Sequence, residues 1–368
     1  MNVEEPWYIK DIDFNAELKQ LDIWIDFQKG SKFLCPKCSD ENCSVYDTVE
    51  KVWRHLNFFE YKTYLHCRVP RVKCNDCGVH QIEVPWTRKQ SGFTLLMDAI
   101  ILTLAQSMPI LKVAKMLDEH DTKIWRVIIY YVKKSRAKED FSRVSIVGID
   151  ETSFKKGHKY VTIVADIENS KVLYVCEGKD ASTLTKFNED LTNHGGEPTM
   201  IRSISCDMSP SFINGIKNEF PDSKIIFDKF HVMKMMNEAV DEVRKQEQLT
   251  VKELKNSKYL WLKNENNLSK EQSERFLSLK NQNLKTVRAY NIKSSLQEFW
   301  NSQNRKEATQ YLKKWYFWAT HSRLTPITEA ANTVKKHWEG IMNYFDSKIT
   351  NGILEGINSI VQLQKRNA

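Results

Sequence analysis

The sequence lacks any apolar run long enough to cross a membrane. The nearest candidate, 95–104, is interrupted by Asp98 and Thr103, whereas a membrane-spanning helix needs about 20 mostly apolar residues. The first nine residues contain two Glu and no basic residue, which is unlike a secretory signal peptide. Only 12 Gly and 9 Pro occur in 368 residues, which excludes fibrous and proline-rich classes. We therefore expect a soluble, cytoplasmic protein with no membrane partner.

The composition is that of a globular protein with a small excess of positive charge. Hydrophobic residues make up 41% of the chain, and 55 Lys and Arg oppose 47 Asp and Glu, for a net charge of +8. At about 100–200 residues per domain, this length predicts two to four domains. The positive charge favours a polyanionic partner without identifying it.

The eight cysteines are unevenly distributed, and six of them lie between Cys35 and Cys77. They include two Cys-x-x-Cys pairs, Cys35 with Cys38 and Cys74 with Cys77. Four thiolates in tetrahedral geometry are typical of a structural zinc site, which leaves no coordination position for catalysis. Apparent strands at 52–59 and 61–72 would bring the two pairs together, so we predict a zinc ribbon with an inserted hairpin.

Other assignments of these residues remain open at this stage. The pairs would alternatively be a redox motif or buried free thiols. Cys43 and Cys67 are further thiols, and His55, His66 and His80 are further candidate zinc ligands.

Three amphipathic helices are predicted within 95–136, which favours a helix-turn-helix domain. The expected apolar stripe of the first helix consists of Leu96, Ala99, Ile100 and Leu104. The third helix would contact DNA through the polar and aromatic residues of its first turns, which are Thr122, Lys123, Trp125 and Arg126. Residues 86–143 contain 11 basic and 6 acidic residues, which is +5 of the total charge. The alternative is a helical linker with a solvated basic face.

The periodicity changes after residue 144. Strands are predicted at 144–150, 159–167, 171–177, 200–207 and 224–227, with helices at 181–191, from 209 to about 220, and from about 231. Three consecutive strands followed by alternating helices and strands is the element order of a ribonuclease H-like fold. We therefore predict a multidomain α/β protein with a mixed-sheet core in its second half.

Acidic residues end two of the predicted strands. Asp150 follows the first strand and Asp207 ends the fourth, and ligand sites in α/β sheets gather at such carboxyl ends. Two neighbouring carboxylates repel each other, and a pair of divalent cations relieves that repulsion and can activate a nucleophile at phosphorus. The final helix, about 353–365, places Glu355 in a polar stripe with Asn358 and Gln362. Periodicity alone leaves open whether that stripe faces solvent or the aspartates.

Residues 231–345 are rich in Lys, Glu, Asn and large aromatic residues. We predict an all-helical insertion at about 235–345, within which the aromatic side chains form a core rather than a base-stacking surface.

Several motifs resemble those of the insertion-sequence transposases of the ISL-three family, which carry a DDE triad. The matching segments are Gly148-Ile-Asp-Glu-Thr-Ser-Phe-Lys-Lys-Gly-His158, Cys206-Asp-Met-Ser-Pro210, Phe227-Asp-Lys-Phe-His-Val232, Asn351-Gly-Ile-Leu-Glu-Gly-Ile-Asn358 and Lys365-Arg366. The resemblance extends in order from about residue 31 to residue 368. It implies an N-terminal segment (1–30), a zinc ribbon (31–86), a helix-turn-helix DNA-binding domain (87–140) and a ribonuclease H-like DDE transposase domain (141–368).

The resemblance also implies residue roles and partners. Asp150, Asp207 and Glu355 would be the catalytic triad that binds Mg²⁺ or Mn²⁺, and Asp228 and His231 would support the site. The ribbon would bind Zn²⁺, and the ribbon and the helix-turn-helix together would bind the ends of the element. The expected partners are double-stranded DNA, namely the element's terminal inverted repeats and target DNA. The expected assembly is a homodimer or larger in the synaptic complex, located in the bacterial cytoplasm in association with the nucleoid.

Two alternative functions remain at this stage. Family members usually continue past Lys365-Arg366 with a basic and aromatic stretch, whereas this sequence ends 13 residues after Glu355. The first alternative is therefore an inactive or truncated transposase-derived DNA-binding protein that acts as a repressor. The second is a ribonuclease H-like nuclease acting on RNA or branched DNA.

Overall fold

The computed structural model describes residues 3–155 and 159–367 and divides the chain into two compact units. The first unit extends to Ala137, and the second comprises residues 138–366. Lys156, Gly157 and His158, which end the first family-like motif, lie outside the described residues. None of the helices in the described ranges has both the length and the apolar character needed to cross a bilayer.

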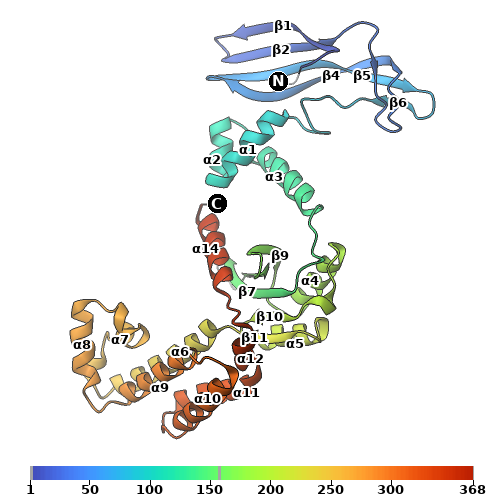
Figure 1. The fold of residues 1–368 in the computed structure, drawn as a ribbon. Helices are drawn as coiled ribbons and strands as arrows, with labels where there is room; N and C mark the ends of the chain where they lie inside the picture. The colour runs from blue at the N-terminus through green and yellow to red at the C-terminus, as the bar shows by residue number, and fades with distance from the viewer. Residues whose placement is uncertain (1–2, 156–158, 368) are drawn as a thin grey trace. The chain divides into compact units, whose positions relative to one another are not determined.

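The first unit contains a six-stranded sheet built around one long antiparallel hairpin (Figure 1). The strands are β1 (Trp7–Asn15), β2 (Gln20–Phe27), β3 (Lys32–Phe33), β4 (Cys43–Phe58), β5 (Tyr61–Cys74) and β6 (Gly78–Gln81). Their spatial order is β1-β2-β5-β4-β3, and β6 also pairs with β5. The N-terminal segment, in which the sequence shows no motif, thus supplies two strands. Ile23 and Ile25 of β2, two residues apart and therefore on one face of the strand, are buried in the core of the sheet.

Three helices follow the sheet, as the sequence predicts: α1 (Leu95–Ser107), α2 (Ile110–Leu117) and α3 (Asp121–Arg136). Their shared core includes Ile101, Val113 and Ile124. The predicted apolar face of α1 is partly right: Ile100 and Leu104 pack against this core, whereas Leu96 is 46% exposed and Met97 is buried instead. Asp98, which the predicted face also leaves out, is fully buried and accepts a hydrogen bond from Arg88 Nε at 2.8 Å.

The second unit is built on a five-stranded mixed sheet of ribonuclease H-like topology, as the sequence predicts. The strands are β7 (Ile146–Lys155), β8 (Lys159–Asp166), β9 (Lys171–Glu177), β10 (Ser203–Cys206) and β11 (Lys224–Phe227). Their order is β11-β10-β7-β8-β9, with β10 parallel to both β7 and β11 and the β7–β8–β9 meander antiparallel.

One strand boundary differs from the prediction in a way that affects the site. β7 does not end at Asp150 but continues to Lys155, because Glu151, Thr152 and Ser153 keep pairing with β8. Asp150 therefore lies within a strand, whereas Asp207 follows β10 directly. The fourth strand is also shorter than predicted, since a 3₁₀ turn occupies Pro198–Met200.

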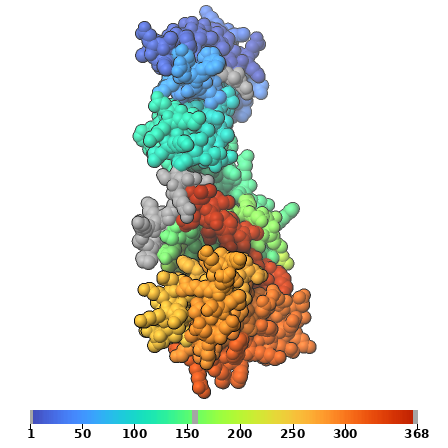
Figure 2. Space-filling model, turned by 90° about the vertical axis from the view of Figure 1, so that its left-hand side faces the viewer, coloured from blue at the N-terminus to red at the C-terminus, as the bar shows by residue number. Residues whose placement is uncertain are grey.

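Helices surround this sheet and form the insertion. They are α4 (Ser182–Asn193), α5 (Pro210–Glu219), α6 (Lys229–Gln248), α7 (Lys258–Leu262), α8 (Lys270–Lys280), α9 (Lys285–Phe299), α10 (Arg305–Thr320), α11 (Thr325–Lys336), α12 (Trp338–Met342), α13 (Tyr344–Ser347) and α14 (Gly352–Asn367). Figure 2 shows the insertion in yellow and orange below the red residues of α14. Trp261, Phe299 and Trp315 are buried in its core, as predicted, whereas Phe317 and Trp318 are exposed.

The final helix, α14, packs on β7 at a glycine. A Cβ atom built on Gly148 would lie 2.7 Å from Leu354 Cδ1 and 3.0 Å from Ile167 Cδ1. Leu354 is fully buried in a small core with Ile163 and Ala165 of β8. The missing side chain at Gly148 thus allows the helix that carries Glu355 to lie against the strand that carries Asp150.

We expect Gly148→Ala to lower the free energy of unfolding by about 1–3 kcal/mol, because the added methyl group overpacks the contact between α14 and β7. Chemical denaturation monitored by circular dichroism measures this loss. The matched control is Gly356→Ala on α14, where nothing lies within 4 Å of an added Cβ atom; it should leave stability unchanged or raise it by up to about 1 kcal/mol. Equal stability of the Gly148→Ala variant and the unsubstituted protein would contradict the packing account.

Candidate metal centres

The four cysteines predicted to bind zinc lie together in the first unit. The sulfur atoms of Cys35, Cys38, Cys74 and Cys77 all lie within 4.8 Å of one another, and those of Cys38 and Cys74 are 3.4 Å apart. Cys74 ends β5, and the Cys74–Cys77 turn leads into β6. The inserted hairpin therefore closes the 35-residue gap between the two pairs, as the sequence predicts.

The thiol chemistry of this cluster fits a metal ion. The backbone amides of Cys38 and Lys37 stabilise the Cys35 thiolate and lower its pKa to about 7. Hydrogen bonding to Cys38 and burial raise the pKa of Cys77 to about 12, since crowded thiols resist sharing negative charge. A divalent cation removes that repulsion, and four sulfur ligands are the set that Zn²⁺ prefers.

The three histidines considered as alternative zinc ligands are engaged elsewhere. His66 Nε2 lies 2.5 Å from Asp22 Oδ1, His55 Nδ1 lies 2.8 Å from Thr94 Oγ1, and His80 Nε2 lies 2.7 Å from the Cys77 carbonyl oxygen. Cys43 lies beside the cluster, with its sulfur 3.3 Å from Asp40 Oδ2, and forms a second possible ligand group with Asp40 and Cys74.

Several carboxylates of the second unit gather where β7 passes the carboxyl end of its parallel neighbour β10. The β7–β10 register pairs Gly148 with Ser205, which places Asp150 and Asp207 two residues further along neighbouring strands. Burial raises the pKa of Asp150, and repulsion by the Asp207 carboxylate contributes to the rise. Nε2 of His231 on α6 lies 3.8 Å from Asp150 Oδ1 and offsets part of this effect.

Amide side chains of α14 bind directly to β7. Asn358 Nδ2 donates to Asp150 Oδ2 at 2.6 Å, and Gln362 Nε2 donates to Thr152 Oγ1 at 2.6 Å. Asn351, just before the helix, donates to the Ile149 carbonyl oxygen at 3.4 Å. The polar stripe of the last helix therefore faces the strand and not only solvent. The sequence pattern places Asn358 and Gln362 in that stripe but does not indicate these contacts.

Glu355 and Asp228 lie in an adjoining cavity of about 580 Å³. Its walls include Lys293 and Trp300 of the helical insertion. Asp228 is 4% exposed at the start of α6; burial raises its pKa, while nearby His231 and the backbone amides of Asn351 and Phe230 oppose the rise. Within the described residues, the carboxylates of Asp150, Asp207 and Glu355 do not all lie within 4.8 Å of one another.

Glu151 is an acidic residue beside this site that is not among the residues predicted from the sequence. Burial raises its pKa, and repulsion by Asp207 and Asp150 adds to the effect, while Lys179 opposes it. Its backbone amide donates to Asp150 Oδ1 at 2.8 Å. The donor set around Asp150 is therefore rich in crowded, partly desolvated carboxylates, which fits hard divalent cations such as Mg²⁺.

The predicted DNA-contacting residues of α3 are all solvent-exposed: Thr122, Lys123, Trp125 and Arg126. Lys123 forms an ion pair with Glu119 at 2.8 Å, so part of its charge is neutralised.

We expect Cys35→Ser and Cys74→Ser each to abolish zinc binding and to lower the melting temperature of the first unit, because the remaining thiolates cannot complete a tetrahedral shell. Metal analysis of the purified protein should show about one zinc per chain before substitution and almost none after it. Cys176→Ser, a half-buried thiol of β9, is the control and should retain zinc. Unchanged zinc content in the Cys35 and Cys74 variants would refute the site.

We expect Asp150→Asn to stabilise the chain in EDTA at pH 7. The pKa of Asp150 is raised above its ordinary 3.8 in the folded state, so the ionised carboxylate costs stability increasingly as the pH rises through the folded-state pKa. The buried Asn358 Oδ1 has no partner in the described structure, so that amide can rotate to accept from Asn at position 150.

Thermal melts from pH 3.5 to 8 measure this effect. The advantage of the variant should shrink toward the acidic end, where the carboxyl group is mostly protonated in both states. Added Mg²⁺ should raise the melting temperature of the unsubstituted protein more than that of the variant. An advantage of the same size at every pH would contradict the electrostatic explanation.

Comparisons with known proteins agree with these structural features. A family described as "Transposase" matches residues 147–368, the helix-turn-helix domain of transposase family ISL3 matches residues 82–132, and the zinc-finger of transposase IS204/IS1001/IS1096/IS1165 matches residues 31–77. The transposase for insertion sequence element IS1001 of Bordetella parapertussis is 27% identical over 344 residues, covering 91% of this chain and 84% of the relative. The transposase for IS1557 of Mycobacterium tuberculosis is 25% identical over 370 residues, covering 91% and 81%. The chain belongs to the ISL3 family of DDE transposases.

Proposed function

We propose that this chain binds the terminal inverted repeats of its own insertion sequence and, with divalent metal ions, cleaves and joins DNA strands there. The main supporting observation is that the register of β7 and β10 brings Asp150 on β7 close enough to Asp207, just after β10, for their charges to interact, with Asn358 of α14 hydrogen-bonded to Asp150. Family membership supports the same assignment.

In this proposal Asp150 and Asp207 hold two Mg²⁺ or Mn²⁺ ions, and Glu355 completes the ligand set. The ions, when bound, polarise the scissile phosphate and lower the pKa of the attacking water or hydroxyl. Asn358 fixes the orientation of the Asp150 carboxylate through its 2.6 Å hydrogen bond. His231 and the buried Asp228 are positioning residues at the start of α6.

The proposed reaction has two steps at phosphorus. In the first, a water oxygen attacks the phosphate at the end of the element, the P–O3′ bond breaks and a free 3′-hydroxyl is left. In the second, that hydroxyl attacks a target phosphate, and a target 3′ oxygen leaves. Because two ends must react together, we further propose that a homodimer or larger assembly performs these steps on double-stranded DNA.

The structural zinc centre has a separate proposed role. Zn²⁺ bound to Cys35, Cys38, Cys74 and Cys77 would fix the ribbon, while Thr122, Lys123, Trp125 and Arg126 on α3 contact DNA. The ribbon and the three helices belong to one compact unit, so zinc loss should weaken DNA binding indirectly.

We expect Asp150→Asn and Asp207→Asn, and also Glu355→Gln, to reduce Mg²⁺-dependent cleavage of a plasmid carrying both element ends by at least about 100-fold, because each removes a proposed metal ligand. Binding to end DNA should persist in all three. Asp222→Asn, an exposed residue before β11, is the control and should cleave normally. Undiminished cleavage by any one triad variant would remove that residue from the proposed ligand set.

The unsubstituted protein distinguishes the alternatives in the same assay. Cleavage at linear element ends with Mg²⁺ and none with EDTA supports the proposal. End binding without cleavage would favour a DNA-binding repressor, and preferred cleavage of RNA–DNA hybrids or branched DNA would favour a different nuclease.

A further inference from the structure

A short loop, 87–91, joins the zinc ribbon to the three helices and is fixed from both sides. Thr87 Oγ1 donates to the Phe93 carbonyl oxygen at 2.8 Å, and the Phe93 amide donates to Ser91 Oγ at 3.0 Å. The Arg54 amide of β4 donates to the Gly92 carbonyl oxygen at 2.9 Å. The loop is therefore anchored to the sheet and to the segment that begins α1.

Arg88 anchors the same loop to the helices. Its Nε donates to the buried Asp98 at 2.8 Å, and its guanidinium lies 4.4 Å from the centre of the Tyr130 ring on α3. The neighbouring Lys89 and Gln90 are exposed, and Gln90 adopts a left-handed backbone conformation with φ 59°. The contacts of Arg88 thus fix the turn in which the side chains of Lys89 and Gln90 are exposed to solvent.

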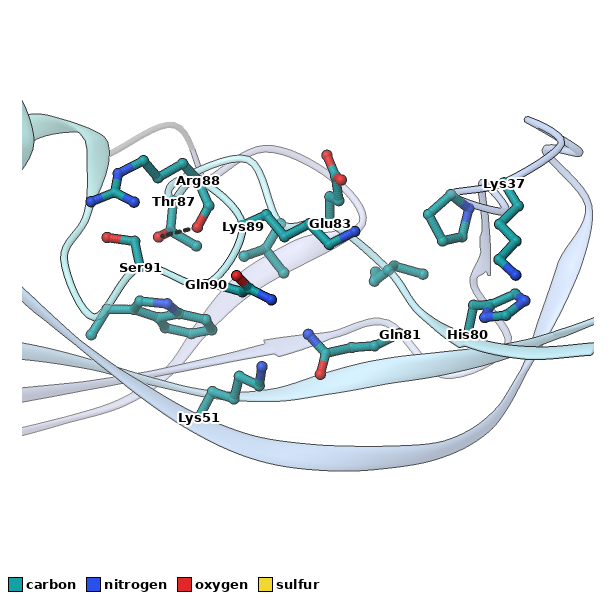
Figure 3. A pocket seen from close by; sticks show the side chains of 14 residues that line it. Lys37, Lys51, His80, Gln81, Glu83, Thr87, Arg88, Lys89, Gln90 and Ser91 are labelled. Atoms are coloured by element: carbon teal, nitrogen blue, oxygen red, sulfur yellow. Dashed lines mark hydrogen bonds between the residues drawn. The ribbon is translucent and has the colours of Figure 1, made fainter. Parts of the chain in front are cut away.

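The loop borders two hollows of the first unit. One, of about 800 Å³, lies toward α3; its charged lining residues besides the loop are Lys123, Arg126 and Lys133, and it has no acidic residue. The other, of about 390 Å³, lies toward the ribbon and includes Lys37 and Lys51 with a single acid, Glu83. In Figure 3, Lys51, Gln81 and Gln90 project into the space between the sheet and the loop.

The lysines of the ribbon-side hollow have no carboxylate partner in the described structure, unlike many other cations of the sheet. Ion pairs neutralise five cations elsewhere on it: Lys10 with Asp26, Lys19 with Glu60, Lys62 with Asp118, Arg68 with Asp26 and Arg71 with Asp47. Across the described part of the chain, no carboxylate forms an ion pair with Lys37, Lys51 or Lys89. The positive charge of this hollow is therefore available to an anionic partner.

We infer that Lys37, Lys51 and Lys89 form a second DNA-contacting surface on the ribbon. It would bind phosphates of the same duplex that α3, the proposed reader helix, contacts. This inference rests on the proposed function, because the duplex that contacts the ribbon is the same element-end DNA that α3 is proposed to bind. A duplex presents phosphates at regular intervals along each strand, and the shared loop makes the two basic hollows continuous. Such contacts fix the register of the protein on DNA without reading its sequence.

The experiment measures the affinity of the full chain for a labelled duplex taken from one end of its element, and for an unrelated duplex, across a range of salt concentrations. Lys51→Ala and Lys89→Ala should each weaken binding to both duplexes by a similar factor. Each should also make the slope of log K against log salt shallower by about 0.9. Zinc content and melting temperature should stay unchanged.

Two further variants make the result decisive. Lys10→Ala is the control, because Lys10 lies on β1 at the opposite edge of the sheet and is paired with Asp26; its binding and slope should equal those of the unsubstituted protein. Arg126→Ala on α3 tests the proposed reader helix. If Arg126→Ala weakens end binding while the Lys51 and Lys89 variants bind with unchanged affinity and slope, the ribbon surface is wrong and the proposed function stands. If the unsubstituted chain binds neither duplex, both fail.

Discussion

The contact between α14 and β7 is the constraint on which the candidate nuclease site depends. It joins residues about 200 positions apart in sequence, through the close approach at Gly148 and the hydrogen bonds from Asn358 to Asp150 and from Gln362 to Thr152. Without it, the helical insertion would leave Glu355 with no fixed relation to the two aspartates. In this contact the buried Leu354 side chain contributes stability, and the amide of Asn358 orients the Asp150 carboxylate.

Ionised carboxylates at that interface are electrostatically unfavourable. Desolvation and mutual repulsion make the carboxylates of Asp150 and Glu151 harder to ionise than exposed ones. A fold whose only requirement was stability would place amides or apolar residues there. Raised carboxylate pKa values of this kind are characteristic of sites that bind cations or react. The zinc ribbon has the same property with sulfur ligands. Its four cysteine thiols lie so close together that a bound cation would offset the repulsion between their thiolates.

Most elements of the fold were predictable because local patterns and tertiary structure agree. The fifth strand of the core and the three helices of the first unit lie where periodicity places them, and the cysteine spacing predicts the cluster that forms. The errors have tertiary causes. On α1, Met97 and the ion-paired Asp98 are buried while Leu96 is exposed, and pairing with β8 extends β7 beyond Asp150. Neither Arg88 nor β8 is visible as a partner from local sequence. The sequence does not predict the hairpin of β1 and β2, because its place in the sheet depends on parallel pairing of β2 with the distant strand β5.

The site itself was only partly predictable. Strand order explains why Asp150 and Asp207 become neighbours, but periodicity cannot determine which partner covers the polar stripe of the last helix. The roles of Asp150, Asp207 and Glu355 as one metal-binding set remain the central proposal. Fe²⁺ substituted for Mg²⁺ in the presence of ascorbate and peroxide tests it directly, because radicals formed at the bound ion cleave the nearest backbone. The account predicts cuts beside Asp150, beside Asp207 and within 352–358, all suppressed by excess Mg²⁺; Mg²⁺-sensitive cuts near the aspartates with none in 352–358 would contradict it.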